Sequence, residues 1–204
     1  DGIRGPISSK TSPDFILKLG WAAGEVFKDQ GISSFIIGKD TRISGYMLEA
    51  ALQAGIISSG LNVRLVGPLP TPAISYLVST FKSQAGIVIS ASHNDYHDNG
   101  IKIFDNYGVK IDRKIEMMIE NILSEEITSL PSVQIGKAKR FDESGPRYVE
   151  FCKSTVPDEI SFTNLRIVLD CANGASYKVS PDVFNELGAE TIVVGDNPDG
   201  FNIN

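Results

Sequence analysis

The sequence predicts an α/β fold: a mixed, mainly parallel sheet with helices on both faces, followed by a second, related α/β domain that is incomplete. Short apolar runs alternate with segments of helical periodicity along most of the chain. The run at 85–90 is continuously apolar, which is typical of a strand that helices cover on both faces. The order strand, helix, strand recurs near the end of the chain. We therefore predict two domains, at 1–156 and 157–204.

The elements of the first domain follow from periodicity and turn residues. Ser12 and Pro13 open a helix, because apolar residues recur at helical spacing over 13–28. Strands and helices then alternate, with strands predicted at 34–37, 62–66 and 85–90 and helices at 44–59 and 72–81. A polar loop at 90–99 follows the third of these strands. We expect it at the carboxyl end of the sheet, where ligands bind in such folds.

Shorter elements follow this loop. The runs 101–104 and 109–111 flank a turn signal, Asp-Asn-Tyr-Gly, which predicts a hairpin. The rest reads as a helix at 114–123, a turn-rich stretch at 124–144, a helix at 148–153, strands at 166–169 and 191–194, and a helix at 175–187.

Composition excludes several classes of protein. Hydrophobic residues make up 42% and charged residues 22% of the chain, as in folded globular proteins. The net charge of −6 argues against nucleic acid or membrane surfaces as partners. No apolar run approaches the roughly 20 residues that span a bilayer. Cys152 and Cys171 form no disulfide framework, so we expect a cytoplasmic protein. A homodimer is compatible with the sequence, which does not decide oligomeric state.

The 90–99 loop holds the strongest candidates for chemistry. Ser92 follows a buried strand, and Lys102 lies ten residues further on, across the predicted turn of the chain. A base must take the proton of a serine hydroxyl before it attacks, and an ammonium can return a proton to a leaving oxygen. The same residues also suit a simple turn with local hydrogen bonds. A serine hydrolase is disfavoured, because no Gly-x-Ser-x-Gly elbow is present and His93 is adjacent in sequence.

Other polar clusters leave their alternatives open. Lys39, Asp40 and Arg42 follow a strand, where they either approach the active site or cap the next helix. Asp170 and Asn173 favour a structural turn over a metal site, since no third ligand accompanies them.

The serine loop carries a family resemblance. Residues 86–94 (Gly-Ile-Val-Ile-Ser-Ala-Ser-His-Asn) and 98–102 (Asp-Asn-Gly-Ile-Lys) resemble the active-site loop of the α-D-phosphohexomutase superfamily. Four further stretches resemble this family in the same order, at 1–5 (Asp-Gly-Ile-Arg-Gly), 38–42 (Gly-Lys-Asp-Thr-Arg), 170–175 (Asp-Cys-Ala-Asn-Gly-Ala) and 197–204 (Asn-Pro-Asp-Gly-Phe-Asn-Ile-Asn). The resemblance covers the whole chain, and within the superfamily it is greatest to the phosphoglucosamine mutase family.

The resemblance implies an isomerase that interconverts glucosamine 6-phosphate and glucosamine 1-phosphate through a 1,6-bisphosphate, for amino-sugar and cell-wall precursors. By matching position, Ser92 is the phosphoserine, His93 and Asn94 shape its loop, Lys102 is the general acid and base, and Arg4 approaches the phosphoryl group. Mg²⁺ is the implied cofactor, bound to Ser92 through its phosphate and to carboxylates. The implied partner is a small phosphosugar.

The sequence departs from the family pattern in two ways. Asp95 follows Ser-His-Asn where the family usually has proline, so we expect a shifted loop that keeps its chemistry. The family's metal loop (Asp-x-Asp-x-Asp-Arg), sugar loop (Gly-Glu-x-Ser-Gly-His) and phosphate loop (Arg-x-Ser-Gly-Thr) do not occur in these residues. We therefore expect an N-terminal fragment that is inactive by itself. Alternatives are a phosphomannomutase or phosphoglucomutase of the same superfamily, and a non-catalytic phosphosugar-binding module.

Overall fold

The structure, a computed structural model, describes residues 3–8, 11–81, 84–128 and 130–204. Its strands are β1 (Ile3–Pro6), β2 (Ser34–Lys39), β3 (Asn62–Pro68), β4 (Gln84–Ile89), β5 (Asp98–Phe104), β6 (Ala138–Arg140), β7 (Arg166–Asp170) and β8 (Glu190–Val194). Its α-helices are α1 (Pro13–Asp29), α2 (Ser44–Ser58), α3 (Thr71–Thr80), α4 (Arg113–Ile122), α5 (Ser144–Ser154) and α6 (Val179–Glu186). Asp1 and Gly2 of the first family-like stretch lie outside the described residues.

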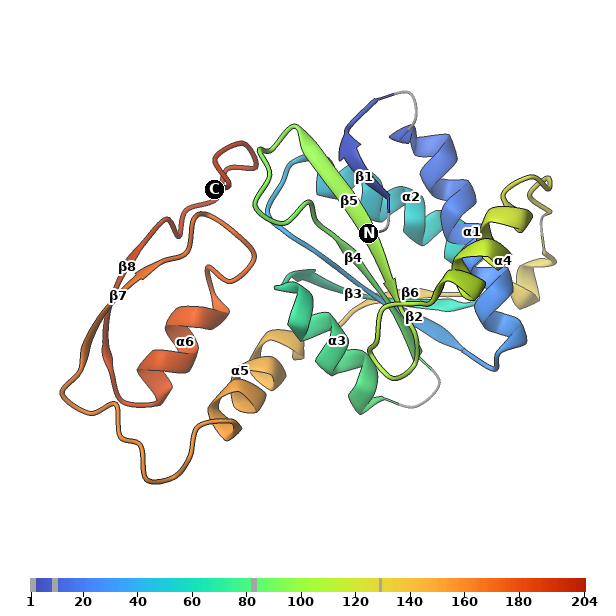
Figure 1. The fold of residues 1–204 in the computed structure, drawn as a ribbon. Helices are drawn as coiled ribbons and strands as arrows, with labels where there is room; N and C mark the ends of the chain where they lie inside the picture. The colour runs from blue at the N-terminus through green and yellow to red at the C-terminus, as the bar shows by residue number, and fades with distance from the viewer. Residues whose placement is uncertain (1–2, 9–10, 82–83, 129) are drawn as a thin grey trace.

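The strands form two sheets, which confirms the predicted fold class (Figure 1). The larger sheet has six strands in the order β1-β5-β4-β2-β3-β6, and the smaller pairs β7 with β8. Strands β4, β2, β3 and β6 run parallel, whereas β5 runs antiparallel to both β4 and β1. The larger sheet is therefore mixed and mainly parallel, with its antiparallel strands along one edge.

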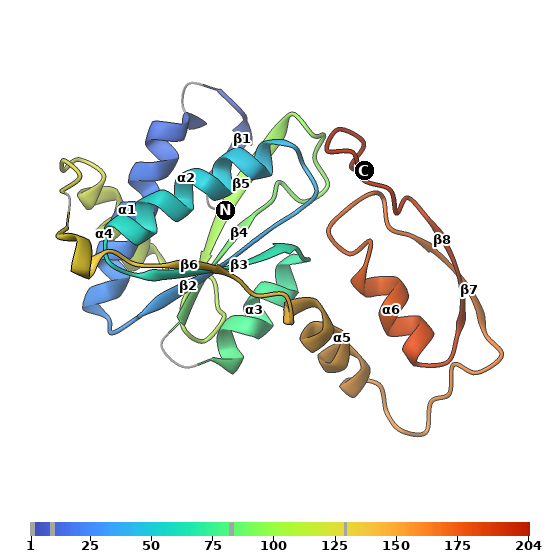
Figure 2. The same cartoon turned by 180° about the vertical axis from the view of Figure 1, so that it is seen from behind.

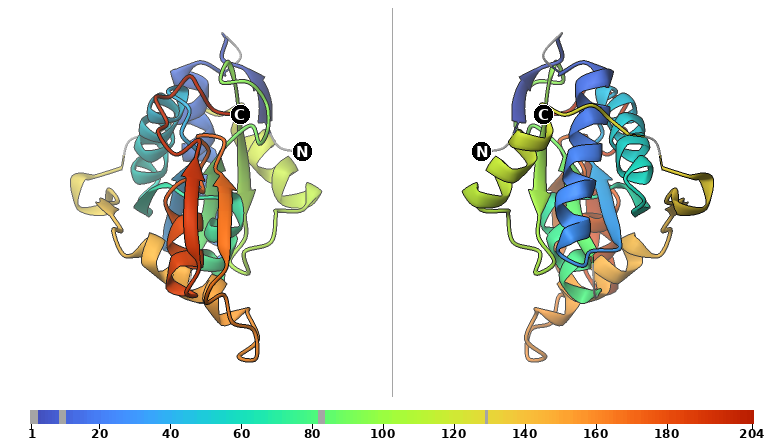
Figure 3. Two further views of the ribbon diagram at one scale, coloured as in Figure 1. Left: turned by 90° about the vertical axis from the view of Figure 1, so that its left-hand side faces the viewer. Right: turned by 90° about the vertical axis from the view of Figure 1, so that its right-hand side faces the viewer.

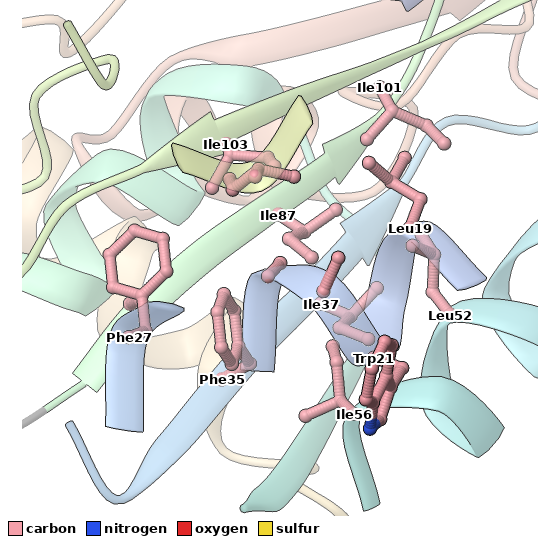
Figure 4. Close-up of a cluster of buried hydrophobic side chains, with 14 of the residues drawn as sticks. Leu19, Trp21, Phe27, Phe35, Ile37, Leu52, Ile56, Ile87, Ile101 and Ile103 are labelled. Carbon is pink, nitrogen blue, oxygen red and sulfur yellow. The ribbon is translucent and has the colours of Figure 1, made fainter. Parts of the chain in front are cut away.

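Helices cover both faces of the larger sheet. On one face α1, α2 and α4 pack on alternate strand residues, including Phe35, Ile37 and Ile87 (Figures 2 and 4). On the other face α3 and α5 pack on Ile36 and Val88. Every residue of β4 is buried, which explains why its sequence is apolar throughout rather than alternating.

Local chemistry explains where the first helix begins and how closely it packs. The Ser12 hydroxyl accepts a hydrogen bond from the Phe15 amide at 3.3 Å, and proline follows at the first helical position. Helix α2 then crosses so closely that a Cβ on Gly55 would lie 2.0 Å from the Leu17 carbonyl oxygen. Glycine is required there because any side chain would collide with the backbone of α1.

The predicted hairpin of 101–104 and 109–111 is present in reduced form, as one antiparallel bridge between Phe104 and Lys110 around the turn at 105–108. Strand β5 begins earlier than predicted, at Asp98, and also forms a hairpin with β4, so the polar loop at 90–97 is itself a hairpin connection. The short strands β1 and β6 were not predicted; both pair with strands far away in the sequence.

The second unit is a two-stranded parallel sheet with α6 packed beside it (Figure 3). The buried cluster on the α3 side also includes Tyr148 and Val149 of α5 and Val179 of α6, so the apolar contact continues past residue 156. Both cysteines are free thiols. Among the described residues, no helix is long and apolar enough to cross a membrane.

Candidate active site

The serine loop (residues 90–97) connects the carboxyl end of β4 to the start of β5. The hydrogen bonding between β4 and β5 continues to the first residue of the loop, where the Ser90 amide donates to the Gly100 carbonyl oxygen at 2.8 Å. Ala91 is fully buried, and Ser92 then turns outward with φ of +59°. A non-glycine residue in this left-handed region is uncommon and is found where surrounding contacts impose it. The turn leaves the Ser92 side chain exposed.

Short hydrogen bonds define the shape of the serine loop. The Ser92 amide donates to the Ser90 hydroxyl at 3.0 Å, and the Asn94 amide donates to the Ala91 carbonyl oxygen at 3.2 Å. The Asn94 side-chain amide donates to Asp98 at 2.7 Å, across the mouth of the hairpin. His93 Nδ1 lies 3.3 Å from Ser92 Oγ, within hydrogen-bond reach of the hydroxyl.

Arg42, just after the carboxyl end of β2, fixes the serine loop through hydrogen bonds to its backbone. Its side chain is completely buried, and Nη2 donates to the carbonyl oxygens of Ser92, at 3.2 Å, and Asn94. Nε reaches the Asp95 carbonyl oxygen at 3.4 Å. The opposite edge of the guanidinium pairs with Asp40, whose carboxylate balances the buried charge. Sequence reasoning treated Arg42 as a secondary candidate; the signal was the charged Gly38–Arg42 stretch after an apolar strand.

The end of the chain lies beside the loop that joins β4 to β5 (Figure 1), and a side chain from it reaches the same two carbonyl groups. The Asn204 side-chain amide donates to the Ser92 carbonyl oxygen at 3.2 Å and to that of Asn94 at 3.0 Å. We call Arg42 and Asn204 together the carbonyl clamp. Neighbouring contacts support it, because the Ile43 amide donates to the Gly200 carbonyl oxygen at 3.0 Å. The sequence placed Asn204 at the end of the family-like stretch 197–204 but gave it no role of its own.

The two predicted cationic residues lie on one face of the sheet. Arg4 pairs with Gly100 across β1 and β5, and Lys102 lies two residues beyond Gly100, so both side chains leave the same face. Arg4 Nη2 donates to the Ala91 carbonyl oxygen at 2.6 Å and to the Asn94 side-chain oxygen. The structure thus joins Arg4 to the serine loop. It shows no contact between Lys102 and Ser92, and within the described residues the Lys102 ammonium has no hydrogen-bond partner.

Asp95, which stands where the family usually has proline, is tied to the outer part of the loop. The backbone amide of His97 donates to its carboxylate at 3.1 Å, and His97 Nδ1 lies at 2.5 Å. These two hydrogen bonds, first the amide and then the imidazole, lower the pKa of the Asp95 carboxyl. The charge of Asp95 is therefore held by His97 and not by the cations near Ser92.

The remaining polar candidates have structural partners. Lys39 forms a buried ion pair with Glu49 at 2.6 Å and lies over the Tyr46 ring. The Asn173 side chain joins two turns: its amide donates to the Asn202 carbonyl oxygen at 3.0 Å, and its oxygen accepts from the Asn197 amide at 3.1 Å. Burial, followed by the charges of two aspartates, raises the pKa of the adjacent Cys171 thiol.

The described residues contain no group of three or more His, Cys, Asp or Glu side chains that could hold a metal ion. A phosphate on Ser92 would supply one oxygen ligand, but Mg²⁺ prefers about six. The described part of the chain therefore does not fit a complete magnesium site.

Comparison with known proteins shows the family of this chain. A family model described as phosphoglucomutase/phosphomannomutase, alpha/beta/alpha domain I, matches residues 1–129. Phosphoglucosamine mutases from Aliivibrio fischeri (strain MJ11) and Vibrio vulnificus (strain YJ016) are 55% and 56% identical over 205 residues. Each alignment covers 100% of this chain and 46% of the relative.

Solved structures give the same result. A phosphoglucomutase/phosphomannomutase family protein from Burkholderia thailandensis superimposes with a TM-score of 0.80 at 25% identity, covering 98% of this chain and 44% of that chain. This chain thus spans about half the length of the curated relatives it matches, and it is homologous to phosphoglucosamine mutases along its whole length. Since the domain I model matches 129 of its 204 residues, the chain belongs to the phosphoglucomutase/phosphomannomutase family.

Proposed function

We propose that this chain supplies the phosphoserine of a mutase that interconverts glucosamine 6-phosphate and glucosamine 1-phosphate through the 1,6-bisphosphate. The observation that carries the proposal is the serine loop, which presents an exposed hydroxyl on a left-handed residue held by the carbonyl clamp. The relatives at 55% and 56% identity bear the name phosphoglucosamine mutase, which favours glucosamine phosphate as the sugar.

The proposed roles follow from position. Ser92 carries the phosphoryl group, and Arg4, whose guanidinium already reaches the loop, neutralises part of its charge. Asn94 fixes the loop through Asp98, and His93 orients the Ser92 hydroxyl when it is not phosphorylated. Lys102, a cation without a partner among the described residues, supplies and removes the proton.

In the first transfer, the bond between phosphorus and Ser92 Oγ breaks and a bond to the free sugar hydroxyl oxygen forms. Lys102 relays the proton: it gives one to the leaving Ser92 Oγ and takes one from the attacking sugar hydroxyl, so its charge is the same before and after the step. The second transfer reverses this chemistry at the other phosphate of the bisphosphate, which leaves the serine phosphorylated again. Stabilising the charge of the transferring group is the main catalytic demand in such reactions.

Mg²⁺ is part of the proposal but not of these steps. It would bind an oxygen of the Ser92 phosphate and supply charge neutralisation during transfer. We infer that its carboxylate ligands belong to the portion of the enzyme by which the relatives exceed this chain, because the described residues form no such cluster. The same reasoning makes this chain inactive by itself.

Ser92→Ala in the complete enzyme tests the proposal. We expect turnover to be abolished, because the phosphoryl group has no attachment point, while Ser79→Ala on the exposed face of α3 keeps full activity. Phosphosite mapping after treatment with glucosamine 1,6-bisphosphate should find phosphate on Ser92.

Retention of even about a tenth of the activity in Ser92→Ala would refute a phosphoserine mechanism. Unmodified Ser92 together with unchanged phosphosugar binding in the variant would instead indicate a binding module. Faster turnover of mannose or glucose phosphates would move the enzyme to another branch of the same family.

A further inference from the structure

A basic groove lies at the end of the larger sheet that is opposite to the serine loop. Its volume is about 550 Å³, and four cations line it: Arg64, Lys137, Lys139 and Arg140. Strand β4 begins at the groove with Gln84 and ends just before the serine loop. At a rise of about 3.3 Å per residue, the groove and Ser92 are on the order of 20 Å apart. The groove is therefore not part of the proposed active site.

The strand register places the polar side chains of the groove on one face. Gln84, Ser34 and Asn62 are direct neighbours across β4, β2 and β3. Arg64 and Lys139 are neighbours in the next layer across β3 and β6. In-register residues of adjacent parallel strands point to the same side, so Gln84, Asn62, Arg64 and Lys139 face one space, whereas Arg140, the next residue of β6, lies at its edge.

The cations of the groove lack counter-ions. None of the four forms an ion pair with any residue that the structure describes, and no carboxylate lines the groove. Arg64 is held in place by aromatic rings, with its guanidinium carbon 5.0 Å from the Phe81 ring centre and 5.7 Å from that of Phe141. A stacked guanidinium keeps its N–H groups free for a ligand, whereas a salt bridge would occupy them.

Gln84 is the independent sign that a ligand belongs here. The residue is only 4% exposed, yet its side-chain oxygen has no hydrogen-bond partner among the described residues. A buried amide without a partner is costly and is normally satisfied by a ligand or water. Four unpaired cations would bind a multiply charged anion most strongly, and the free amide oxygen can accept a hydrogen bond from a hydroxyl group of the same molecule.

We propose that this groove binds a small phosphate ester that also carries hydroxyl groups, at a site separate from Ser92. The phosphate contacts the Arg64 fork and the two lysines, and a hydroxyl of the ester donates to Gln84. The site does not depend on the mutase assignment.

Calorimetric titration of the complete enzyme with glycerol 3-phosphate tests the proposal. We expect binding to weaken about tenfold or more in the double variant Lys137→Gln/Lys139→Gln, since each charge-assisted hydrogen bond contributes strongly to affinity. The matched control is Lys114→Gln/Lys178→Gln, which removes the same charge from exposed positions elsewhere and should leave binding unchanged. Arg4→Ala should also leave this binding unchanged.

Inorganic phosphate, used as a second probe, separates the two halves of the site. Gln84→Leu should weaken glycerol 3-phosphate but not inorganic phosphate, because only the ester has a hydroxyl for the amide. If Gln84→Leu does not fold, the double variant Lys137→Gln/Lys139→Gln tests the proposal by itself. Absence of saturable binding, equal weakening in both double variants, or loss of binding in Arg4→Ala would each overturn the proposal.

Discussion

Arg42 is a buried guanidinium that fixes backbone rather than substrate. Its donors reach the carbonyl oxygens of Ser92, Asn94 and Asp95, and Asp40 balances its charge. Removing one partner of such a buried pair typically costs about 3–5 kcal/mol. The residue therefore acts on Ser92 through the loop, as a positioning residue.

Arg42→Lys should lower kcat by about 10- to 100-fold with little change in KM, because lysine keeps the charge but loses the planar fork that fixes three carbonyls. Steady-state kinetics of the complete enzyme would measure this. Arg113→Lys, at an exposed position on α4, is the control and should change neither parameter. A variant that loses only thermal stability, with kcat intact, would show that Arg42 has no positioning role.

Lys102→Ala should lower kcat by about 10²- to 10⁴-fold if this amine transfers the proton. Lys102→Arg should remain impaired, since a guanidinium stays protonated in proteins and cannot give up and regain a proton near neutral pH. Lys114→Ala on α4 controls for the loss of a surface charge. Recovery of activity in Lys102→Arg would indicate an electrostatic role, and a rise in KM alone would indicate substrate binding.

At the residue scale, the sequence was most informative where chemistry depends on residue identity. The Ser-Ala-Ser-His-Asn string and Lys102 could be selected because of the strand before them and the family they resemble. For Arg42 the sequence left open whether it approaches the site or caps a helix, because nothing in a linear motif shows that a charged side chain is wholly buried under another loop. Asn204 was missed because its partners lie 110 and 112 residues away.

At the scale of elements, aromatic side chains join helix α5 to helix α3. Tyr76 of α3 stacks on Phe151 at 4.0 Å between ring centres, and Tyr148 lies 6.2 Å from Tyr76. Burial, followed by a hydrogen bond with Cys152, raises the pKa of Tyr148 to about 12. The phenol therefore stays protonated where exposed tyrosines have ionised.

Ultraviolet titration of tyrosinate should show one tyrosine with a pKa of about 12 in place of the ordinary 10.0, and Tyr148→Phe should remove that late step. Tyr107→Phe, which replaces a residue that is 75% exposed, should leave the late step in place. Because the folded protein holds this proton more tightly than the unfolded chain, stability should fall as pH rises from about 10 to 12. A late step that persists in Tyr148→Phe would contradict the assignment.

Elements were predictable when their own residues carried the signal. Strands β2, β3 and β4 were found from apolar runs, and α1 from its cap and spacing. Strand β6 has three residues, all exposed, and β1 has four with alternating burial, so neither run shows a strand by itself. Both exist because a partner strand distant in sequence supplies their hydrogen bonds.

At the scale of the whole molecule, the two sheets differ in how far they are covered: helices cover both faces of the larger sheet, whereas the β7-β8 sheet leaves apolar side chains exposed. Apolar side chains of β7 and β8 are exposed, with Val168 at 67% and Ile192 and Val194 at 45% each. Two strands rarely form a stable sheet alone, and such apolar surface usually packs against further structure. This agrees with a chain that covers 46% of its relatives. The domain division at residue 156 stays a proposal, since apolar packing continues across it.

Besides the apolar packing of α5 against α6, a second set of contacts between the two units lies near the serine loop. Thr41 donates to the Asn173 carbonyl oxygen, the Ile43 amide bonds to Gly200, and Asn204 completes the carbonyl clamp. Sequence patterns could predict the elements of each unit separately, but they could not predict these contacts between the units. Its partners are backbone groups, which every residue possesses, so no residue type marks them in advance.

The carbonyl clamp also has a consequence for how the loop can change during evolution. Arg42 and Asn204 donate to main-chain oxygens, so these hydrogen bonds do not depend on the side chain at position 95. Proline and aspartate offer the same carbonyl oxygen as an acceptor. Substitutions at position 95 should therefore leave the orientation of Ser92 unchanged, provided that Arg42 and Asn204 persist.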